Sequence, residues 1–270
     1  MRIGCIKYLN ARPLIRGWPG QVTLDDPTTL CAQLARGDVD LALVSSSEFL
    51  RNPVYRIVDG ISISSDGPVY SVFVAHLGDI AEIEEIELDP ASETSVNLLR
   101  CLLAQRGLSP RFVARSTSSS VGARVLTRGK DLRLGTAAST AHHARLLIGD
   151  QAIRFRQEHG HEFKFWDLGE QWKKLIDLPF VYALWLVRPE VVDAKAIAKR
   201  LRALRDENLA KIDKLIADEK EFDREFCNRY YRKHLRFSFG EKEKEGLRLF
   251  QELCVKHDLL PEREIVFAVV

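Results

Sequence analysis

The chain has 270 residues, of which 46% are hydrophobic, and its 40 basic and 38 acidic residues leave a net charge of +2. This length and hydrophobic content can bury a large core and suit one big domain or two lobes of ordinary size. Charges of both signs are interspersed along the chain, so we expect no nucleic-acid or membrane surface and predict a small-molecule partner.

The first residues and the cysteines indicate a cytoplasmic protein. The chain goes from Met1 straight into a predicted strand, without the apolar segment of a secretion signal. Its five cysteines are odd in number, widely spaced and mostly embedded in apolar runs, as is typical of reduced thiols. The longest apolar run, residues 178–187, contains Pro179 and is strand-sized, so we expect no membrane span. The oligomeric state is left open.

The first third of the chain alternates short apolar runs with amphipathic segments, which is the rhythm of βαβ units and predicts a largely parallel sheet. Strands are predicted at residues 2–6, 21–24 and 40–44. A helix is predicted over residues 27–36, because an aspartate precedes it, Pro27 can take its first position and Gly37 follows its end. Next, Ser45 to Glu48 has the spacing of a capping box at another helix start.

The rest of the chain continues the alternation and then becomes helical. Further strands are predicted at residues 55–58, 69–74, 86–88, 111–114, 132–135, 145–148 and 178–187. A polar loop is expected at residues 64–68, and an apolar-striped helix at residues 96–106, ended by Gly107. Residues 193–232 and 241–256 have helical spacing of apolar residues with charges on the other face. The long apolar strand at 178–187 is typical of a return crossing between two lobes.

Several kinds of active site lack sequence support. The pairs His142-His143 and His159 with His161 do not have the i, i+4 spacing of a helical zinc site, and no cysteine pair lies close enough to help. The Gly-x-Ser-x-Gly, Gly-x-Gly-x-x-Gly and Gly-x-x-x-x-Gly-Lys-Ser/Thr motifs are all missing from the sequence. We therefore predict no metal, no bound dinucleotide and no other cofactor.

What remains is a set of neutral polar residues at strand ends and helix starts. They are Asn10, Ser45, Ser46, Ser47, Ser71, Ser92, Thr94 and Ser95. Hydroxyl and backbone N–H groups at a helix start can hold carboxylates without an arginine. Each hydroxyl taken alone is better explained as a helix cap, and Asn10 is equally well explained as the closure of a turn before Pro13, but their joint placement favours a binding site. Ser71 differs, because we expect it inside an apolar strand, where its hydroxyl needs a specific partner.

Taken together, these segments resemble the chorismate dehydratase family of the futalosine route to menaquinone. The matching segments are, in order, residues 8–10 (YLN) with 13–14 (PL), 37–40 (GDVD) with 47–50 (SEFL), 65–71 (SDGPVYS), 94–96 (TSV) with 98–99 (LL), 146–152 (LLIGDQA), 167–172 (DLGEQW) and 178–185 (LPFVYALW). The resemblance runs from residue 2 to about residue 188, and the C-terminal helices add little to it.

The resemblance implies a two-lobed α/β fold of the type II periplasmic-binding-protein kind. Each lobe is then a mainly parallel sheet flanked by helices, and the ligand cleft lies between the lobes. On this basis we expect lobe 1 to comprise residues 1–86 and 179–270, and lobe 2 to comprise residues 87–178.

The resemblance also implies roles for individual residues. Asn10 and Ser71 correspond to the asparagine and serine of the family's active site. The expected substrate-binding residues are Ser45, Ser46, Gly67, Thr94 and Ser95. Two segments depart from the family pattern, because residues 91–93 (ASE) stand where a serine or threonine is often followed by arginine, and residues 136–143 match no family segment.

The implied reaction makes the protein a lyase. It removes the C3 proton and the C4 hydroxyl of chorismate and gives 3-[(1-carboxyvinyl)oxy]benzoate and water, driven by aromatisation and without a cofactor. Neither asparagine nor serine is a good base, so the proton acceptor is a substrate carboxylate, a water or another residue. Two alternatives stay open: a small-anion binding or sensing protein of the same fold, and the related 1,4-dihydroxy-6-naphthoate synthase, whose usual Ser-Pro and Asn-Asp opening differs from residues 8–10 here.

Overall fold

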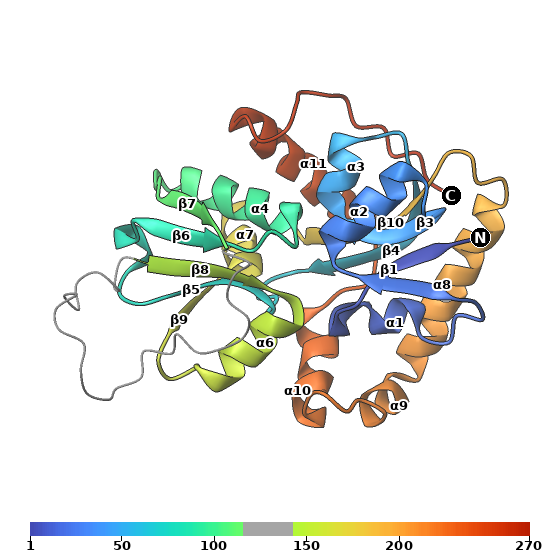
Figure 1. Cartoon of the computed structure of the whole chain (residues 1–270), viewed down its shortest axis with the longest axis horizontal. Helices are drawn as coiled ribbons and strands as arrows, with labels where there is room; N and C mark the ends of the chain where they lie inside the picture. Colours follow the sequence, from blue (N-terminus) through green and yellow to red (C-terminus); the bar gives the residue numbers. More distant parts are fainter. Residues whose placement is uncertain (116–142) are drawn as a thin grey trace.

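Two five-stranded sheets lie side by side and organise the chain (Figure 1). The computed structural model describes residues 1–115 and 143–270. The strand order is β2-β1-β3-β10-β4 in the first sheet and β7-β6-β8-β5-β9 in the second. The strands are β1 (Ile3–Ile6), β2 (Val22–Asp25), β3 (Leu41–Ser45), β4 (Arg56–Ser65), β5 (Val72–His76), β6 (Glu85–Leu88), β7 (Arg111–Ala114), β8 (His143–Ile148), β9 (Lys164–Asp167) and β10 (Phe180–Val187). The strand predicted at residues 132–135 and the unmatched residues 136–142 lie outside the described residues.

In each sheet one strand runs against the other four. Strand β10 is antiparallel to both β3 and β4, and β5 is antiparallel to both β8 and β9, whereas the remaining pairs are parallel. The reversed strands follow the two places where the chain crosses between the sheets, residues 66–71 and residues 177–179. All eight residues of β10 are buried, which explains the unbroken apolar run in the sequence. The predicted return crossing is therefore present.

The sheets divide the chain at a different place from the one expected. Strand β5 belongs to the second sheet, although it lies within the 1–86 segment assigned to lobe 1. We therefore propose that lobe 1 ends at the 66–71 crossing and that lobe 2 begins with β5. The other predicted boundary, between residues 178 and 179, falls inside the second crossing.

Helices cover both faces of each sheet; in the second sheet α4 and α6 lie on opposite faces (Figure 1). The helices are α1 (Arg12–Ile15), α2 (Pro27–Arg36), α3 (Ser46–Arg51), α4 (Glu93–Ala104), α6 (Gly149–Glu158), α7 (Leu168–Ile176), α8 (Ala194–Ala210), α9 (Ile212–Ala217), α10 (Arg224–Arg229) and α11 (Glu241–Lys256), with 3₁₀ turns η1 (Leu9–Ala11) and η2 (Ile80–Glu82) and a π-helical turn η3 (Tyr230–His234). Among the described residues no helix is long and apolar enough to span a membrane.

The structure corrects several local predictions. Strand β4 continues through the first two residues of the predicted 64–68 loop, and β5 begins three residues later than predicted, so Ser71 precedes the strand instead of lying inside it. Helix α4 begins at Glu93, three residues early. The capping box at Ser45 does not form, because Ser45 makes no side-chain cap bond and the Glu48 carboxylate bonds instead to the side chains of Arg51 and Asn52.

The C-terminal helix α11 ties the two lobes together. The ring of Phe250 in α11 lies 4.9 Å from that of Phe180 in β10 and 6.1 Å from that of Trp172 in α7, measured between centroids. Gly246 allows this close packing, since a Cβ there would lie 2.2 Å from the carbonyl oxygen of Pro179. The helix therefore packs on the second crossing, on β10 of the first sheet and on α7 of the other lobe.

Candidate active site

A small cavity of about 40 Å³ lies between the lobes. It is lined by Ile6, Tyr8, Asn10, Pro27, Ser45, Ile63, Val69, Ser71, Val72, Ser92, Ser95, Ile148, Gly149, Tyr182 and Ala183. Four of the seven residues predicted to form the site, Asn10, Ser45, Ser71 and Ser95, are brought together here from distant parts of the chain. The other three, Ser46, Gly67 and Thr94, lie outside this lining.

The ends of parallel strands and the starts of helices build this cavity. Asn10 lies in the turn η1 after β1, Ser45 ends β3, and Ser95 is in the first turn of α4. Ser71 ends the first crossing, and Gly149 begins α6 directly after β8. These are the positions at which open α/β sheets bind their ligands, since strand ends and helix N-termini converge there.

Two polar groups in the cavity have hydrogen-bonding capacity left over. The Asn10 Oδ1 atom is buried and has no partner among the described residues. The Ser71 hydroxyl is fully buried and accepts a hydrogen bond of 2.7 Å from the phenol of Tyr230, and no acceptor for its own proton is found in the described part of the chain. Since buried polar groups are almost always paired, an unused acceptor and an unused donor facing one cavity indicate a ligand with complementary groups.

The crossing that carries Ser71 is held by the buried carboxylate of Asp167, at the start of α7. Asp167 accepts hydrogen bonds from the backbone N–H groups of Val69 (3.0 Å), Tyr70 (2.8 Å) and Glu170 (3.1 Å). Burial raises the pKa of Asp167 above its ordinary value, and the three N–H bonds oppose that shift. Tyr70 itself is held with φ at +70°, and the Arg156 guanidinium lies 4.3 Å from the centre of its ring.

Glycine is required where this crossing meets α7. A Cβ at Gly169 would lie 2.5 Å from the carbonyl oxygen of Gly67 and 2.8 Å from the hydroxyl of Tyr182. Gly67 adopts φ of +128°, a backbone conformation that favours glycine. We expected Gly67 to bind substrate, but it does not line the cavity, and its place is in shaping the turn that leads to Ser71.

Contacts between the lobes close around the cavity. The backbone N–H of Leu9 donates to the carboxylate of Asp150 at 2.8 Å, and burial raises the pKa of Asp150. The ring of Tyr8 packs on Gly149, where a Cβ would approach it to 2.8 Å. The first strand and its turn are thereby joined to the start of α6 in the other lobe.

The hydroxyls at the start of α4 divide into two groups. The Ser92 Oγ atom caps the helix by accepting from the N–H of Ser95 at 3.3 Å, and lies 3.4 Å from the Ser45 hydroxyl. The Thr94 hydroxyl instead accepts from the N–H of Ser47 at 2.9 Å and donates to the Ser47 hydroxyl at 3.0 Å. Ser46 donates to the carbonyl of Val181 at 2.7 Å. Ser46 therefore makes a contact within lobe 1, and Thr94 makes a contact between the lobes. Neither residue lines the cavity.

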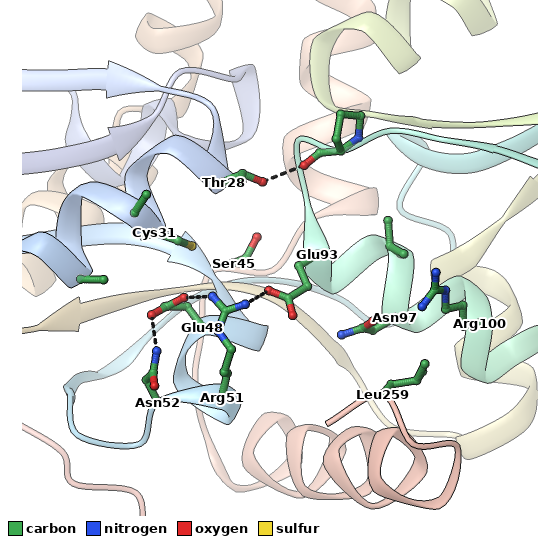
Figure 2. Close-up of a pocket in the computed structure, with 14 residues that line it drawn as sticks. Thr28, Cys31, Ser45, Glu48, Arg51, Asn52, Glu93, Asn97, Arg100 and Leu259 are labelled. Atoms are coloured by element: carbon green, nitrogen blue, oxygen red, sulfur yellow. Dashed lines mark hydrogen bonds and ion pairs between the residues drawn. The ribbon is translucent and has the colours of Figure 1, made fainter. Parts of the chain in front are cut away.

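A larger hollow of about 530 Å³ lies between α2, α3 and α4 (Figure 2). On its wall Arg51 forms ion pairs with Glu48 of its own lobe and Glu93 of the other. Asn97 Nδ2 and Arg100 Nε, both on α4, are buried there without a hydrogen-bond partner among the described residues. Ser45 is the one predicted site residue that lines it. We place the candidate active site in the smaller cavity, because four of the predicted site residues line it, among them Asn10 and Ser71 with their unused hydrogen-bonding groups.

Three tyrosines belong to the site and were missed as site residues. Tyr8 and Tyr182 line the cavity, and Tyr230 lies outside the lining but donates a hydrogen bond to Ser71. Tyr8 and Tyr182 stand inside segments that resemble the family, so a signal for them was present. Tyr230 had none, because it lies in the charged helical region. No group of three potential metal ligands occurs within residues 1–115 and 143–270.

Comparison with known proteins identifies the family to which the chain belongs. The family model described as menaquinone biosynthesis matches residues 1–256. The chain is 29% identical over 272 residues to the chorismate dehydratase of Thermus thermophilus, covering 93% of each sequence.

Solved structures show the same fold at low sequence identity. Protein AF1704 of Archaeoglobus fulgidus superposes with a TM-score of 0.67 at 16% identity, covering 96% of this chain and 98% of that one. The alkanesulfonate-binding protein SsuA of Xanthomonas axonopodis pv. citri gives a TM-score of 0.64 at 18% identity, covering 100% of this chain and 97% of that one. The fold is thus the predicted two-lobed α/β fold of the type II periplasmic binding proteins, and the chain belongs to the menaquinone biosynthesis family.

Proposed function

We propose that this protein is a chorismate dehydratase, a lyase that converts chorismate to 3-[(1-carboxyvinyl)oxy]benzoate and water in the futalosine route to menaquinone. The observation that carries the proposal is the pair of unused groups in the interlobe cavity, the Asn10 Oδ1 acceptor and the Ser71 hydroxyl donor. Support comes from the family and from the chorismate dehydratase of Thermus thermophilus. A cytoplasmic location, expected from the sequence, forms part of the same proposal.

The two groups suit the two kinds of oxygen on chorismate. The Ser71 O–H donates to a carboxylate oxygen, and Ser95 at the start of α4 adds the favourable end of the helix dipole. The Asn10 Oδ1 atom accepts from the C4 hydroxyl and so orients it as the leaving group. The C3–H electrons form the new ring double bond as the C4–O bond breaks, and the departing hydroxide with the C3 proton makes water.

The proton has to be taken up by something other than a basic side chain of the cavity wall. The residues that line the cavity include hydroxyls, an amide and apolar groups, and among the described residues none of the lining side chains is a carboxylate or an imidazole. The nearby Asp150 carboxylate accepts from the Leu9 N–H. We therefore assign the proton to a substrate carboxylate or a bound water, with the enzyme supplying orientation and exclusion of solvent.

Substrate entry requires the lobes to separate. The cavity of about 40 Å³ holds little more than a water or two, whereas pockets for drug-sized ligands measure roughly 300 Å³ or more. The two crossings at residues 66–71 and 177–179 are the places where the lobes can rotate apart, as in other hinged binding folds. The structure then corresponds to a closed arrangement in which apolar residues such as Ile63 and Val72 shield the reacting groups.

Incubating purified protein with chorismate and following products by liquid chromatography with mass detection tests the proposal directly. We expect a product lighter than chorismate by one water. Asn10→Ala and Ser71→Ala should each lower kcat by about 100-fold or more, as expected when a group that binds the transition state is removed. Asn228→Ala is the matched control, since Asn228 is exposed and bonds only to Arg232 among the described residues. It should keep wild-type turnover.

Other outcomes point to the alternatives. Binding of chorismate without turnover, measured by calorimetry, would indicate a small-anion binding or sensing protein. No binding and no turnover would overturn the assignment of substrate, and the larger substrate of 1,4-dihydroxy-6-naphthoate synthase would be tried next. Full turnover by Asn10→Ala would remove Asn10 from the scheme while leaving the reaction in place.

A further inference from the structure

The π-helical turn η3 reaches both halves of the candidate active site. The hydroxyl of Tyr230 donates to Ser71 Oγ at 2.7 Å, across 159 positions of sequence. The hydroxyl of the next residue, Tyr231, donates to the carbonyl of Leu9 at 3.0 Å, directly before Asn10. Two adjacent side chains of one turn thus bond to the segments that carry the two proposed catalytic residues.

The turn is built to hold Tyr230 in place. The N–H of Leu235 donates to the carbonyl of Tyr230 at 3.1 Å, which is the i to i+5 bond of a π-helix, a form that occurs mainly as single turns and frequently at functional sites. The Tyr230 ring is fully buried and stacks on Phe226 with 5.4 Å between centroids. Its hydroxyl therefore has little freedom to turn away from Ser71.

The direction of the hydrogen bond decides what Ser71 can do. A serine hydroxyl that accepts a bond keeps its single proton for another acceptor. Burial raises the pKa of Tyr230, so the phenol stays protonated and remains a donor. With Tyr230 donating, the Ser71 proton is free for an oxygen in the cavity, and one lone pair of Ser71 is already occupied.

We propose that Tyr230 is a positioning residue, which orients the Ser71 hydroxyl so that it donates to a substrate carboxylate. Tyr230 is absent from the cavity lining, and for that reason we do not assign it contact with the substrate. This inference rests on the proposed function, because Ser71 is given its substrate contact there. It also gives the C-terminal third of the chain, which carried no functional signal in the sequence, a part in the reaction.

A double-mutant cycle tests the inference. Tyr230→Phe removes only the hydroxyl and should lower kcat for chorismate about tenfold with KM changed by no more than about twofold, as expected from loss of one well-aligned hydrogen bond. In a Ser71→Ala protein the same change should have an effect on kcat of less than about twofold, because the bond is already absent. Tyr55→Phe is the control, since it removes the hydroxyl of another buried tyrosine, which bonds to Glu48 and does not line the cavity, and should leave kcat unchanged.

The outcomes separate the inference from the function on which it rests. If Tyr230→Phe keeps the wild-type kcat, or lowers kcat by the same factor with and without Ser71, the positioning role is wrong although the enzyme is a chorismate dehydratase. If the wild-type protein does not dehydrate chorismate, the proposed function fails first and this inference fails with it. Urea unfolding of each variant shows whether a fall in kcat comes from loss of folded protein.

Discussion

Removing the Asp167 carboxylate should weaken both the folded state and the site, because this one side chain fixes the crossing that leads to Ser71. It is 2% exposed and accepts from three backbone N–H groups, two of them in the crossing and one in the first turn of α7. Asp167→Ala leaves all three donors without this acceptor. Asp167→Asn keeps an oxygen at the Oδ1 position, where Val69 and Glu170 donate, but can place an amide N–H against the donor of Tyr70.

The geometry gives the size of the expected effect. A hydrogen bond to a charged acceptor contributes about 1.5 kcal/mol or more, so three lost bonds correspond to a fall of about 4.5 kcal/mol or more in the free energy of unfolding. The asparagine variant loses one bond and should fall by about 1 to 2 kcal/mol. Since domains of this kind are stable by roughly 5 to 15 kcal/mol, the alanine protein should still fold but lose much of its margin.

Urea unfolding followed by circular dichroism, together with kcat for chorismate, measures these effects. Asp79→Ala is the control, because Asp79 also caps a turn, accepting from the N–H of Ala81 at 3.0 Å in η2, but is exposed and lies at the other end of β5 from the crossing. We expect it to cost about 1 kcal/mol and to leave kcat unchanged. Equal losses of stability in Asp167→Ala and Asp79→Ala would refute the assignment of Asp167 as the group that fixes the crossing.

Three further predictions concern the lobe contacts and the pH dependence of stability. Gly149→Ala should lower the free energy of unfolding by about 2 kcal/mol or more and reduce turnover, because Gly149 has φ of +61° and a Cβ there would clash with the ring of Tyr8. Urea unfolding measures the stability, and kcat for chorismate measures the turnover. Thr94→Val should destabilise by about 1 to 3 kcal/mol through the unpaired Ser47 N–H, whereas Thr94→Ser should not, and chorismate KM should change little in either variant. Burial lowers the pKa of His76, so as pH falls this histidine is protonated in the unfolded chain before it is protonated in the folded protein. The free energy of unfolding should therefore decrease as pH falls through about 6.5. His76→Gln should reduce this dependence of the free energy of unfolding on pH, measured by urea titrations from pH 7.5 to 5.5.

Local sequence signals predicted the elements whose limits are set by short-range chemistry. Helix α2 runs over residues 27–36 as predicted, with Pro27 at its start and Gly37 in the left-handed conformation at its end. Strand β10 was recognisable because a strand buried on both faces reads as an unbroken apolar run. The start of strand β5 was predicted three residues too early, because residues 69–71 continue its apolar run. In the structure the backbone N–H groups of Val69 and Tyr70 donate to the Asp167 carboxylate, and the strand begins only at Val72.

The candidate site was predictable as far as its residues stand at ends of elements. Asn10, Ser45 and Ser95 follow strands or begin helices, and topology then brings them to one cavity. Whether a hydroxyl faces that cavity or a neighbouring element depends on where the other lobe lies. Thr94 and Ser95 are adjacent on one helix turn, yet Thr94 bonds to Ser47 across the lobe boundary and Ser95 lines the cavity.

The contribution of Tyr230 shows why the remaining part of the site escapes a reading of local pattern. A tyrosine in a charged helical region resembles any core aromatic residue, and its apolar ring does pack as one, against Phe226. Its function in the proposed scheme depends on a single O–H direction toward a residue 159 positions away. In this scheme the π-helical turn and the crossing that Asp167 holds set that direction. Two elements that lie far apart in the sequence therefore orient the O–H group of Ser71. If this is correct, Asp167→Asn and Tyr230→Phe should lower kcat through the same hydroxyl, and each should have a smaller effect once the other is present.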